Sequence, residues 1–303
     1  MIHSIGLFQA VRIAVAGWPD VAAFPSVAFG GSQPALQSAV FAWERVRYRR
    51  SGVALGASQG GKLQGVVSAR RASGPTAWFV DHLVIRDDDA PVCELLESVA
   101  AFAGKRGVER LFLRVPDNGY LLKLVSQSGF SASSQVSLLT LPANSPLYKR
   151  DAQLGMRLRM RADDLGLFRL YNACTPAEVR FKTGMTLQRW QDGQEPRGKR
   201  TRDYVLEQNG EVVAWVRMDL RSGWVKVQSQ TLSHDAVDPA SLVAWAVHTG
   251  GRRTVWEVPE HQVDLQLLLQ RMGFEVGGCY RLMVNSLAPM VRERAWAPAP
   301  TSV

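Results

Sequence analysis

The side chains best suited to acid–base chemistry occur singly, beside β-rich runs and turns. Asp81 and His82 stand inside the run Ala77–Ile85, and a carboxylate or an imidazole can accept a proton in acid–base chemistry. Tyr120 and His261 each follow a Val-Pro pair. For all four a structural role is favoured, as an ion-pair partner, a satisfied core histidine or a neighbour of a helix cap, and a catalytic role is the alternative.

One loop concentrates positive charge. Residues 196–202 carry four cationic side chains, which could bind a phosphate-bearing partner, although a solvated loop is favoured. The whole chain has a net charge of +9, divided as +6 in residues 1–150 and +3 in residues 151–303. Because neither half carries a dominant basic arm, we do not expect nucleic acid to be the partner.

Length and composition bound the kind of protein. A chain of 303 residues with 46% hydrophobic and 21% charged residues predicts a globular protein of two domains. We find neither a signal peptide nor an apolar run long enough to span a bilayer, so we expect a soluble cytoplasmic protein. Three widely separated cysteines fit a reducing compartment and give no metal-binding spacing.

The sequence repeats itself at a period of about half its length. Val115-Pro116 precedes a helical run that ends in Gly129-Phe130, and Val258-Pro259 precedes another that ends in Gly273-Phe274. A short β-rich run comes before each Val-Pro, and a further strand follows each Gly-Phe. The order strand, helix, glycine, strand therefore occurs twice.

The likeness continues upstream of both landmarks. Each copy has a glycine turn entering a strand, then a longer strand, at 77–85 and 224–232, and then a helix, at 91–105 and 239–248. Asp238 precedes Pro239, which predicts an N-cap followed by proline at the first helical position. We predict two domains, residues 1–145 and 155–288, followed by a loose tail at 289–303.

This order of elements resembles the GCN5-related N-acetyltransferase (GNAT) family over nearly all of both halves, most clearly in Phe79 to Ile85 and in the two Gly-Phe endings. The resemblance implies an α/β (α+β) fold of two tandem GNAT-like domains, each a mixed, mostly antiparallel sheet flanked by helices. It also implies acetyl-CoA or another acyl-CoA as co-substrate, and a small-molecule or protein amine as acceptor. By the same resemblance Asp81 is the catalytic base, and the cofactor contacts are Leu83, Ile85, Arg86 and Asn118.

Two family features are replaced here. The family's loop after the fourth strand is rich in glycine, because backbone N–H groups must hold a pyrophosphate, whereas this chain has Asp87, Asp88 and Asp89 in one copy and no glycine in the other. The family's tyrosine, four residues before the Gly-Phe glycine, is replaced by Val125 and Leu269.

Several functions stay open at this stage. The first is an acyl-CoA-dependent N-acyltransferase. The alternative is a catalytically degenerate tandem GNAT-like protein that binds a ligand or serves as a scaffold, and a homodimer is one form that it could take. A third is acyl transfer from a charged tRNA or carrier. Fold resemblance by itself does not decide among them.

Overall fold

The computed structural model describes residues 1–5, 21–23, 52–60, 62–85, 91–117, 119–150, 152–220, 223–232, 236–251 and 253–287. Its strands are β1 (Ile2–Ser4), β2 (Val21–Ala23), β3 (Gly52–Gln59), β4 (Lys62–Arg71), β5 (Ala77–Ile85), β6 (Arg110–Pro116), β7 (Ser131–Thr140), β8 (Arg157–Leu158), β9 (Thr201–Gln208), β10 (Glu211–Leu220), β11 (Trp224–Thr231), β12 (Arg253–Pro259) and β13 (Glu275–Ser286). Its helices are α3 (Val92–Gly104), α4 (Gly119–Gln127), α5 (Asp164–Cys174), α6 (Ala177–Thr183), α7 (Leu187–Asp192), α8 (Pro239–Gly250) and α9 (Val263–Arg271), with short 3₁₀ turns η1 (Pro146–Lys149) and η2 (Arg161–Asp163).

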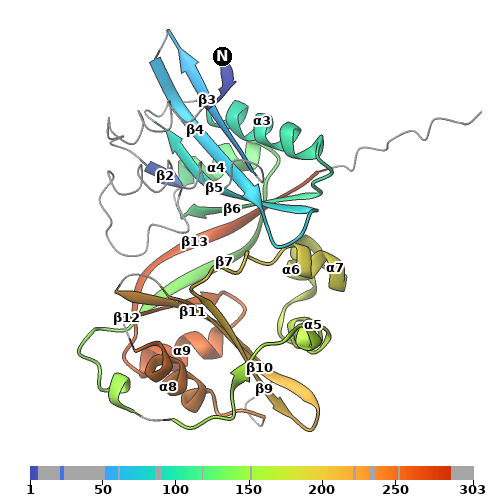
Figure 1. Ribbon diagram of the computed structural model, residues 1–303. Coiled ribbons are helices and arrows are strands. Elements are labelled where there is room, and N and C mark those ends of the chain that lie inside the picture. Colours follow the sequence, from blue (N-terminus) through green and yellow to red (C-terminus); the bar gives the residue numbers. More distant parts are fainter. Residues whose placement is uncertain are drawn as a thin grey trace, which may run out of the picture.

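The strands of the described residues join into one mixed sheet. Its order is β1-β3-β4-β5-β6-β13-β7-β12-β11-β10-β9-β8, and β2 pairs with β5 beside this path. Among the strands of the described residues, β5 with β6 and β11 with β12 run parallel and the other pairs are antiparallel. The mixed, mostly antiparallel sheet with flanking helices, predicted for both halves, is confirmed (Figure 1).

The last strands of the two halves are exchanged. β13, from the end of the second half, pairs antiparallel with β6 of the first half, and β7, from the first half, pairs with β12 of the second. β13 and β7 also pair with each other, so they join the halves at the middle of the sheet (Figure 1). Each half therefore completes its sheet with a strand of the other.

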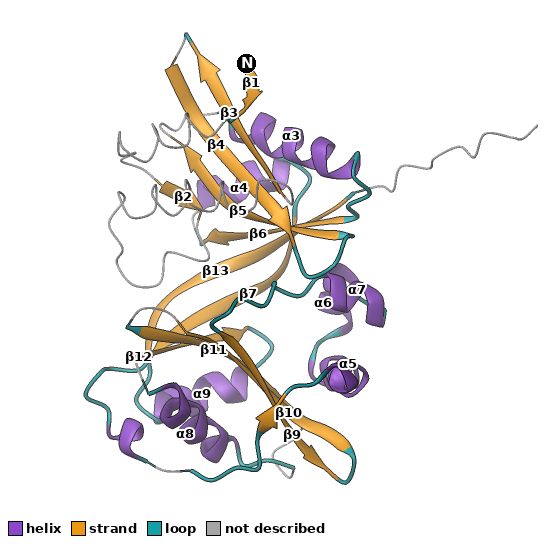
Figure 2. Cartoon of the chain, viewed as in Figure 1, coloured by secondary structure: helices purple, strands orange, loops and turns teal. Residues whose placement is uncertain are grey.

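The hydrophobic cores follow this exchange. One core packs α3 and α4 against the first-half strands and includes Met283 of β13, while the other packs α8 and α9 against β10–β12 and includes Leu139 of β7. In Figure 2, α5 lies on the other side of the second-half strands from α8 and α9. The boundaries at 145 and 155 stay a prediction, and the tail at 289–303 lies outside the described residues.

The repeated Gly-Phe pairs end equivalent helices. Gly129 and Gly273 have positive φ angles of 84° and 92°, which glycine adopts without steric cost. The N–H of Phe130 donates to the carbonyl of Val125 at 3.4 Å, and that of Phe274 to the carbonyl of Leu269 at 3.0 Å. Both phenylalanine rings are buried, so each pair stops a helix and anchors the next strand in the core.

Candidate functional site

Each parallel pair of strands opens into a wedge toward its carboxyl end. β5 and β6 pair from Ala77 and Arg110 as far as Val80 and Leu113, and β11 and β12 pair from Trp224 and Arg253 as far as Val227 and Trp256. All four strands continue beyond these points without pairing to each other. The backbone groups that face each wedge are therefore available to another strand or to a ligand.

The first wedge is occupied by the protein itself. β2 pairs antiparallel with β5, with Val21 opposite Val84 and Ala23 opposite Leu83, and it also contacts β6. Since β4 pairs with the other edge of β5, both edges of β5 are used at Leu83. The backbone of Leu83 is thus engaged on both sides by strands of this chain.

The cofactor contacts expected in the first half stay predictions. Leu83 and Ile85 have buried side chains in the first-half core, and Arg86 and Asn118 lie outside the described residues. The structure therefore brings Leu83 and Ile85 into the hydrophobic core, where their side chains face other apolar groups.

Asp81 lies at the opening of the first wedge, on a β-bulge. Ser68 pairs with His82 and Ala69 with Val80, so Asp81 is the extra residue on β5, and such bulges redirect a side chain. Its Oδ2 accepts a hydrogen bond from Arg70 Nε at 2.5 Å. Burial raises the pKa of Asp81, and the positive charges of Arg70 and Arg114 counteract only part of that effect. Its proposed role as a base stays a prediction.

The other first-half candidates have different surroundings. The His82 ring is buried and its Nδ1 lies 2.9 Å from the Ser68 hydroxyl. Burial, with a smaller contribution from Arg70, lowers the pKa of His82 to about 4. Tyr120 is about half exposed at the start of α4. These surroundings suit a structural histidine and a surface tyrosine.

The second wedge contains a cavity of about 230 Å³. It lies between the free end of β11 and the start of α9, with one turn of α8 and the end of α5 at its sides. The lining residues are Cys174, Ser229, Gln230, Thr231, Leu232, Pro239, Leu242, His261, Gln262, Val263, Asp264 and Leu265.

Only part of the polar lining of this cavity is paired. Gln262 Nε2 donates to the Ser229 carbonyl at 3.1 Å, and Cys174 Sγ donates to the Thr231 carbonyl at 3.0 Å. Both ring nitrogens of His261 and Oε1 of Gln262 are buried and have no hydrogen-bond partner within the described residues. Leaving a buried polar group unpaired costs about 1–3 kcal/mol, so a ligand that pairs with these atoms would be stabilised.

His261 is suited to accept a proton. Burial lowers its pKa below the usual 6.5, against a weaker opposing effect of Glu260, so the ring is neutral at pH 7. A neutral imidazole beside a cavity can act as a general base. The signal in the sequence was its place directly after the repeated Val-Pro landmark.

The start of α8 beside the cavity is already capped. Asp238 Oδ1 accepts from Ala240 N at 3.2 Å and its Oδ2 from Ser241 N at 3.0 Å, as the N-cap prediction required. The Ser241 hydroxyl also donates to Oδ2 at 2.6 Å, and this hydrogen bond, helped by the two backbone ones, lowers the pKa of Asp238. The Asp238 carboxylate thus already pairs with the backbone N–H groups at this helix start, and Pro239 has no N–H to donate. This helix start does not fit a pyrophosphate, while the cavity fits a slender, partly polar chain.

A buried charge network joins the halves near the two wedges. Arg114 and Glu257 occupy matching places two residues before the repeated prolines. Arg114 forms an ion pair with Glu195, and Lys226 Nζ lies 3.4 Å from Glu195 Oε2 and 3.5 Å from Glu257 Oε2. Burial alone would raise the pKa of Glu257, but Lys226 and Arg114 hold it below its usual value.

No sequence motif pointed to this network of Arg114, Glu195, Lys226 and Glu257. Gln228, the counterpart of Asp81, donates a hydrogen bond to Glu257. A carboxylate is therefore present near that position after all, on the neighbouring strand. The signal that could have revealed it was a charged residue inside each buried β-rich run, at the same place in both copies.

Comparison with known proteins gives results only at the level of structure. No family model matches the sequence, and no curated protein matches it. A protein from Pyrococcus horikoshii provisionally assigned as an acetyltransferase superposes with a TM-score of 0.58 at 11% identity, covering 95% of this chain and 90% of that one.

Two further solved structures are similar over almost the whole chain. A GCN5-related N-acetyltransferase from Sphaerobacter thermophilus gives a TM-score of 0.56 at 14% identity, covering 96% of each chain. A tandem GNAT protein from the clavulanic acid biosynthesis pathway, solved without AcCoA, gives 0.55 at 11% identity, covering 95% of this chain and 99% of its own.

The helices and the sheet together settle the fold. Among the described residues, none of the helices combines the length and the apolar character that crossing a bilayer requires. The mixed sheet with its flanking helices and the likeness over the whole chain agree with the fold predicted from the sequence. The described residues therefore have the α/β fold of tandem GNAT proteins.

Proposed function

We propose that this protein is an acyl-CoA-dependent N-acyltransferase whose acyl-pantetheine arm binds in the second wedge. The observation that supports this most strongly is the 230 Å³ cavity there, with the unpaired buried atoms of His261 and Gln262 in its wall. The first wedge has less room for such an arm, because β2 already pairs with β5 in it.

The residues of the second wedge have distinct roles in this proposal. A bound acyl-CoA would supply a thioester-activated acyl group for transfer to an amine. The neutral His261 ring would take the proton that the amine loses as its bond to the acyl carbon forms. Gln262, held by the Ser229 carbonyl, would orient the arm through its free Oε1. Val125 and Leu269 are buried apolar side chains, so the leaving thiolate would take its proton from water.

The alternative is a ligand-binding or scaffold protein without catalysis, and one observation favours it. Asp238 caps α8 with its carboxylate, and a negative charge at that place opposes a pyrophosphate. The acceptor, a small-molecule or protein amine, is part of the proposal, as are a cytoplasmic location and a homodimer.

Acetyl transfer to a panel of amines tests the proposal. Thiol release from acetyl-CoA would be followed for the wild type, for His261→Asn and for the matched control His248→Asn, which changes an exposed histidine on α8. We expect the His261 variant to lose about 100-fold or more in kcat, as general-base removal typically does, and the control to keep wild-type rates. Acetyl-CoA binding without turnover for any amine would favour the alternative.

The same assay separates His261 from Asp81. If Asp81→Asn abolished transfer while His261→Asn did not, the base would lie in the first half, and the assignment to the second wedge would be wrong.

A further inference from the structure

A second cavity, of about 470 Å³, lies where the two halves meet. It is bounded by the turn between β4 and β5 of the first half, by the segment that leads into α5, by α7 and the loop after it, and by β10. The lining residues are Ala72, Ser73, Arg159, Arg161, Asp164, Gln191, Asp192, Gln194, Pro196, Arg197 and Arg217. Cavities of this size commonly hold small molecules.

Positive charge exceeds negative charge around this cavity. Four arginines line it, against two aspartates in the lining and the buried Asp203 behind it. Asp203 alone is shared by three of the arginines. Arg217 Nε lies 2.7 Å from Asp203 Oδ1, whereas Arg197 Nε and Arg159 Nη1 lie 2.8 and 3.7 Å from its Oδ2.

Guanidinium donors remain after these pairs are made. Arg159 Nη2 also bonds Asp164 at 2.6 Å, yet Arg159 Nε is buried and has no partner within the described residues. The Arg161 side chain makes no hydrogen bond or ion pair with any described residue. Burial, together with the charges of Arg159 and Arg217, lowers the pKa of Arg197, which reflects the crowding of cations.

The third carboxylate does not relieve this crowding. Asp192 accepts hydrogen bonds from Thr76 Oγ1 at 2.5 Å and from Gln188 Nε2 at 2.8 Å. Its oxygens are thus occupied by neutral donors at the far side of the cavity. The arginines therefore keep an unmatched positive charge, and the guanidinium of Arg161, which has no partner among the described residues, stands in the wall of the cavity.

We propose that this cavity binds an oxyanion, a phosphate or a carboxylate, carried by a small molecule. Guanidinium groups are planar donors that match such groups in pairs of parallel hydrogen bonds. The walls come from both halves, so the ligand would also hold the halves together. This inference is independent of the acyl-CoA proposal, since no residue lines both cavities.

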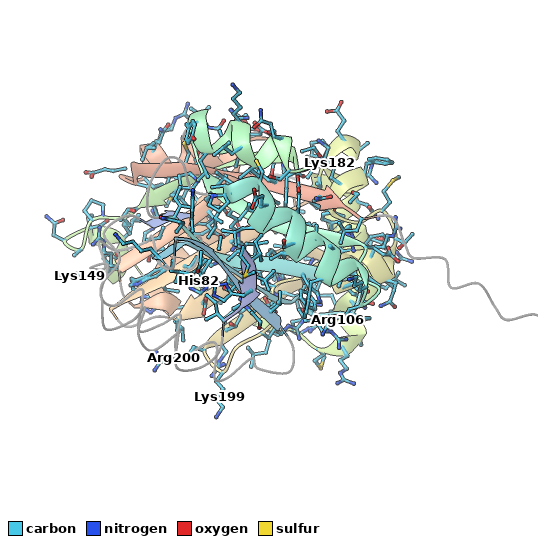
Figure 3. The ribbon with its side chains drawn as sticks, turned by 90° about the horizontal axis from the view of Figure 1, so that it is seen from above. His82, Arg106, Lys149, Lys182, Lys199 and Arg200 are labelled. Atoms are coloured by element: carbon cyan, nitrogen blue, oxygen red, sulfur yellow. The ribbon has the colours of Figure 1, made fainter. Side chains whose placement is uncertain are left out.

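Not every cation of the basic loop belongs to this site. Lys199 and Arg200 are exposed and project away from the body of the molecule (Figure 3), and neither lines the cavity. The loop therefore supplies its own control, because Lys199→Gln and Arg197→Gln remove the same charge two residues apart.

Calorimetric titration with inorganic phosphate, and separately with malonate, tests the inference in the absence of acetyl-CoA. We expect saturable binding of one anion per chain, weakened at least tenfold by Arg197→Gln and by Arg161→Gln and unchanged by Lys199→Gln. The exposed Arg161 serves as a second variant because its loss leaves the Asp203 pairs intact. Preference for phosphate or for malonate identifies the oxyanion.

Two results would overturn the inference. One is the absence of saturable binding for both anions, with the wild type folded. The other is equal weakening by Lys199→Gln and Arg197→Gln, which would indicate attraction by net charge alone.

Discussion

Replacing His82 by Asn should change how the stability of this protein depends on pH. The buried ring of His82 titrates with a pKa of about 4 in the folded protein, against an ordinary 6.5. Between these values the unfolded chain binds a proton that the folded chain does not, so lowering the pH favours unfolding. The stability associated with neutral His82 is complete above pH 6.5 and is lost as the pH falls toward 4.

The size of the effect follows from the same two values. They span roughly 2.5 pH units, and at 1.36 kcal/mol per unit the loss amounts to about 3 kcal/mol in the free energy of unfolding. Asp203 and Glu257 have lowered pKa values and lose stability only near and below their ordinary values of about 4. Asp81 has a raised pKa and acts in the opposite direction. From pH 4.5 to 6.5 the buried histidines therefore lower the stability as the pH falls, and Asp81 offsets part of that loss.

Urea unfolding at half-unit steps from pH 4.5 to 7 measures this slope. We expect His82→Asn to lose about 1.4 kcal/mol less per pH unit below pH 6 than the wild type, because that is the contribution of one such histidine. The variant should have a lower overall stability, and the exposed-site control His248→Asn should parallel the wild type. His261 contributes in the same direction, so some slope remains in the variant. Equal slopes for the wild type and His82→Asn would refute the reasoning.

Three other substitutions have defined outcomes. Asp238→Asn keeps a good N-cap but removes the negative charge that opposes a pyrophosphate at the start of α8. Loss of about 1 kcal/mol of repulsion would make acetyl-CoA binding about fivefold tighter by calorimetry, and unchanged or weaker binding would contradict this. Glu257→Gln leaves the buried Lys226 with one fewer charged partner, and it should lower the free energy of unfolding, measured with urea, by about 3 kcal/mol. A decrease below about 1 kcal/mol would show that the fold does not depend on the network. In Gly74→Ala the added Cβ would overlap Asp192, whose carbonyl accepts from the Gly74 N–H at 3.1 Å. The substitution should therefore lower the thermal midpoint by several degrees. An unchanged midpoint would mean that this contact between the halves adjusts without loss of stability.

Local patterns predicted the elements well, because each pattern reflects a local physical requirement. The Gly-Phe pairs ended helices, since glycine alone takes the positive φ there without strain, and Asp238 capped α8 as expected. β5 and β11 lie where the β-rich runs placed them. These features depend on neighbours within a few residues, which the sequence displays directly.

The strand exchange could not be predicted in this way. β7 and β13 follow equivalent helices, so either could complete either half, and the helix that precedes a strand does not distinguish the two arrangements. The pairing of β2 with Leu83 and Val84 depends on three small apolar residues far upstream. The cluster of arginines around Asp203 unites segments that are separate in the sequence. The repeat drew attention to His261, for which a structural role was favoured, whereas Glu257 lies inside a strand and was not considered.

Binding of acetyl-CoA to the second wedge is the central claim, and calorimetry with one variant for each half tests it most directly. Gln230→Trp would fill the 230 Å³ cavity of the second wedge, while Asp81→Asn alters the opening of the first wedge. Thermal melting would show that each variant is folded. We predict one acetyl-CoA per wild-type chain, retained in Asp81→Asn and lost in Gln230→Trp. Two sites per chain, or undiminished binding in folded Gln230→Trp, would contradict the account.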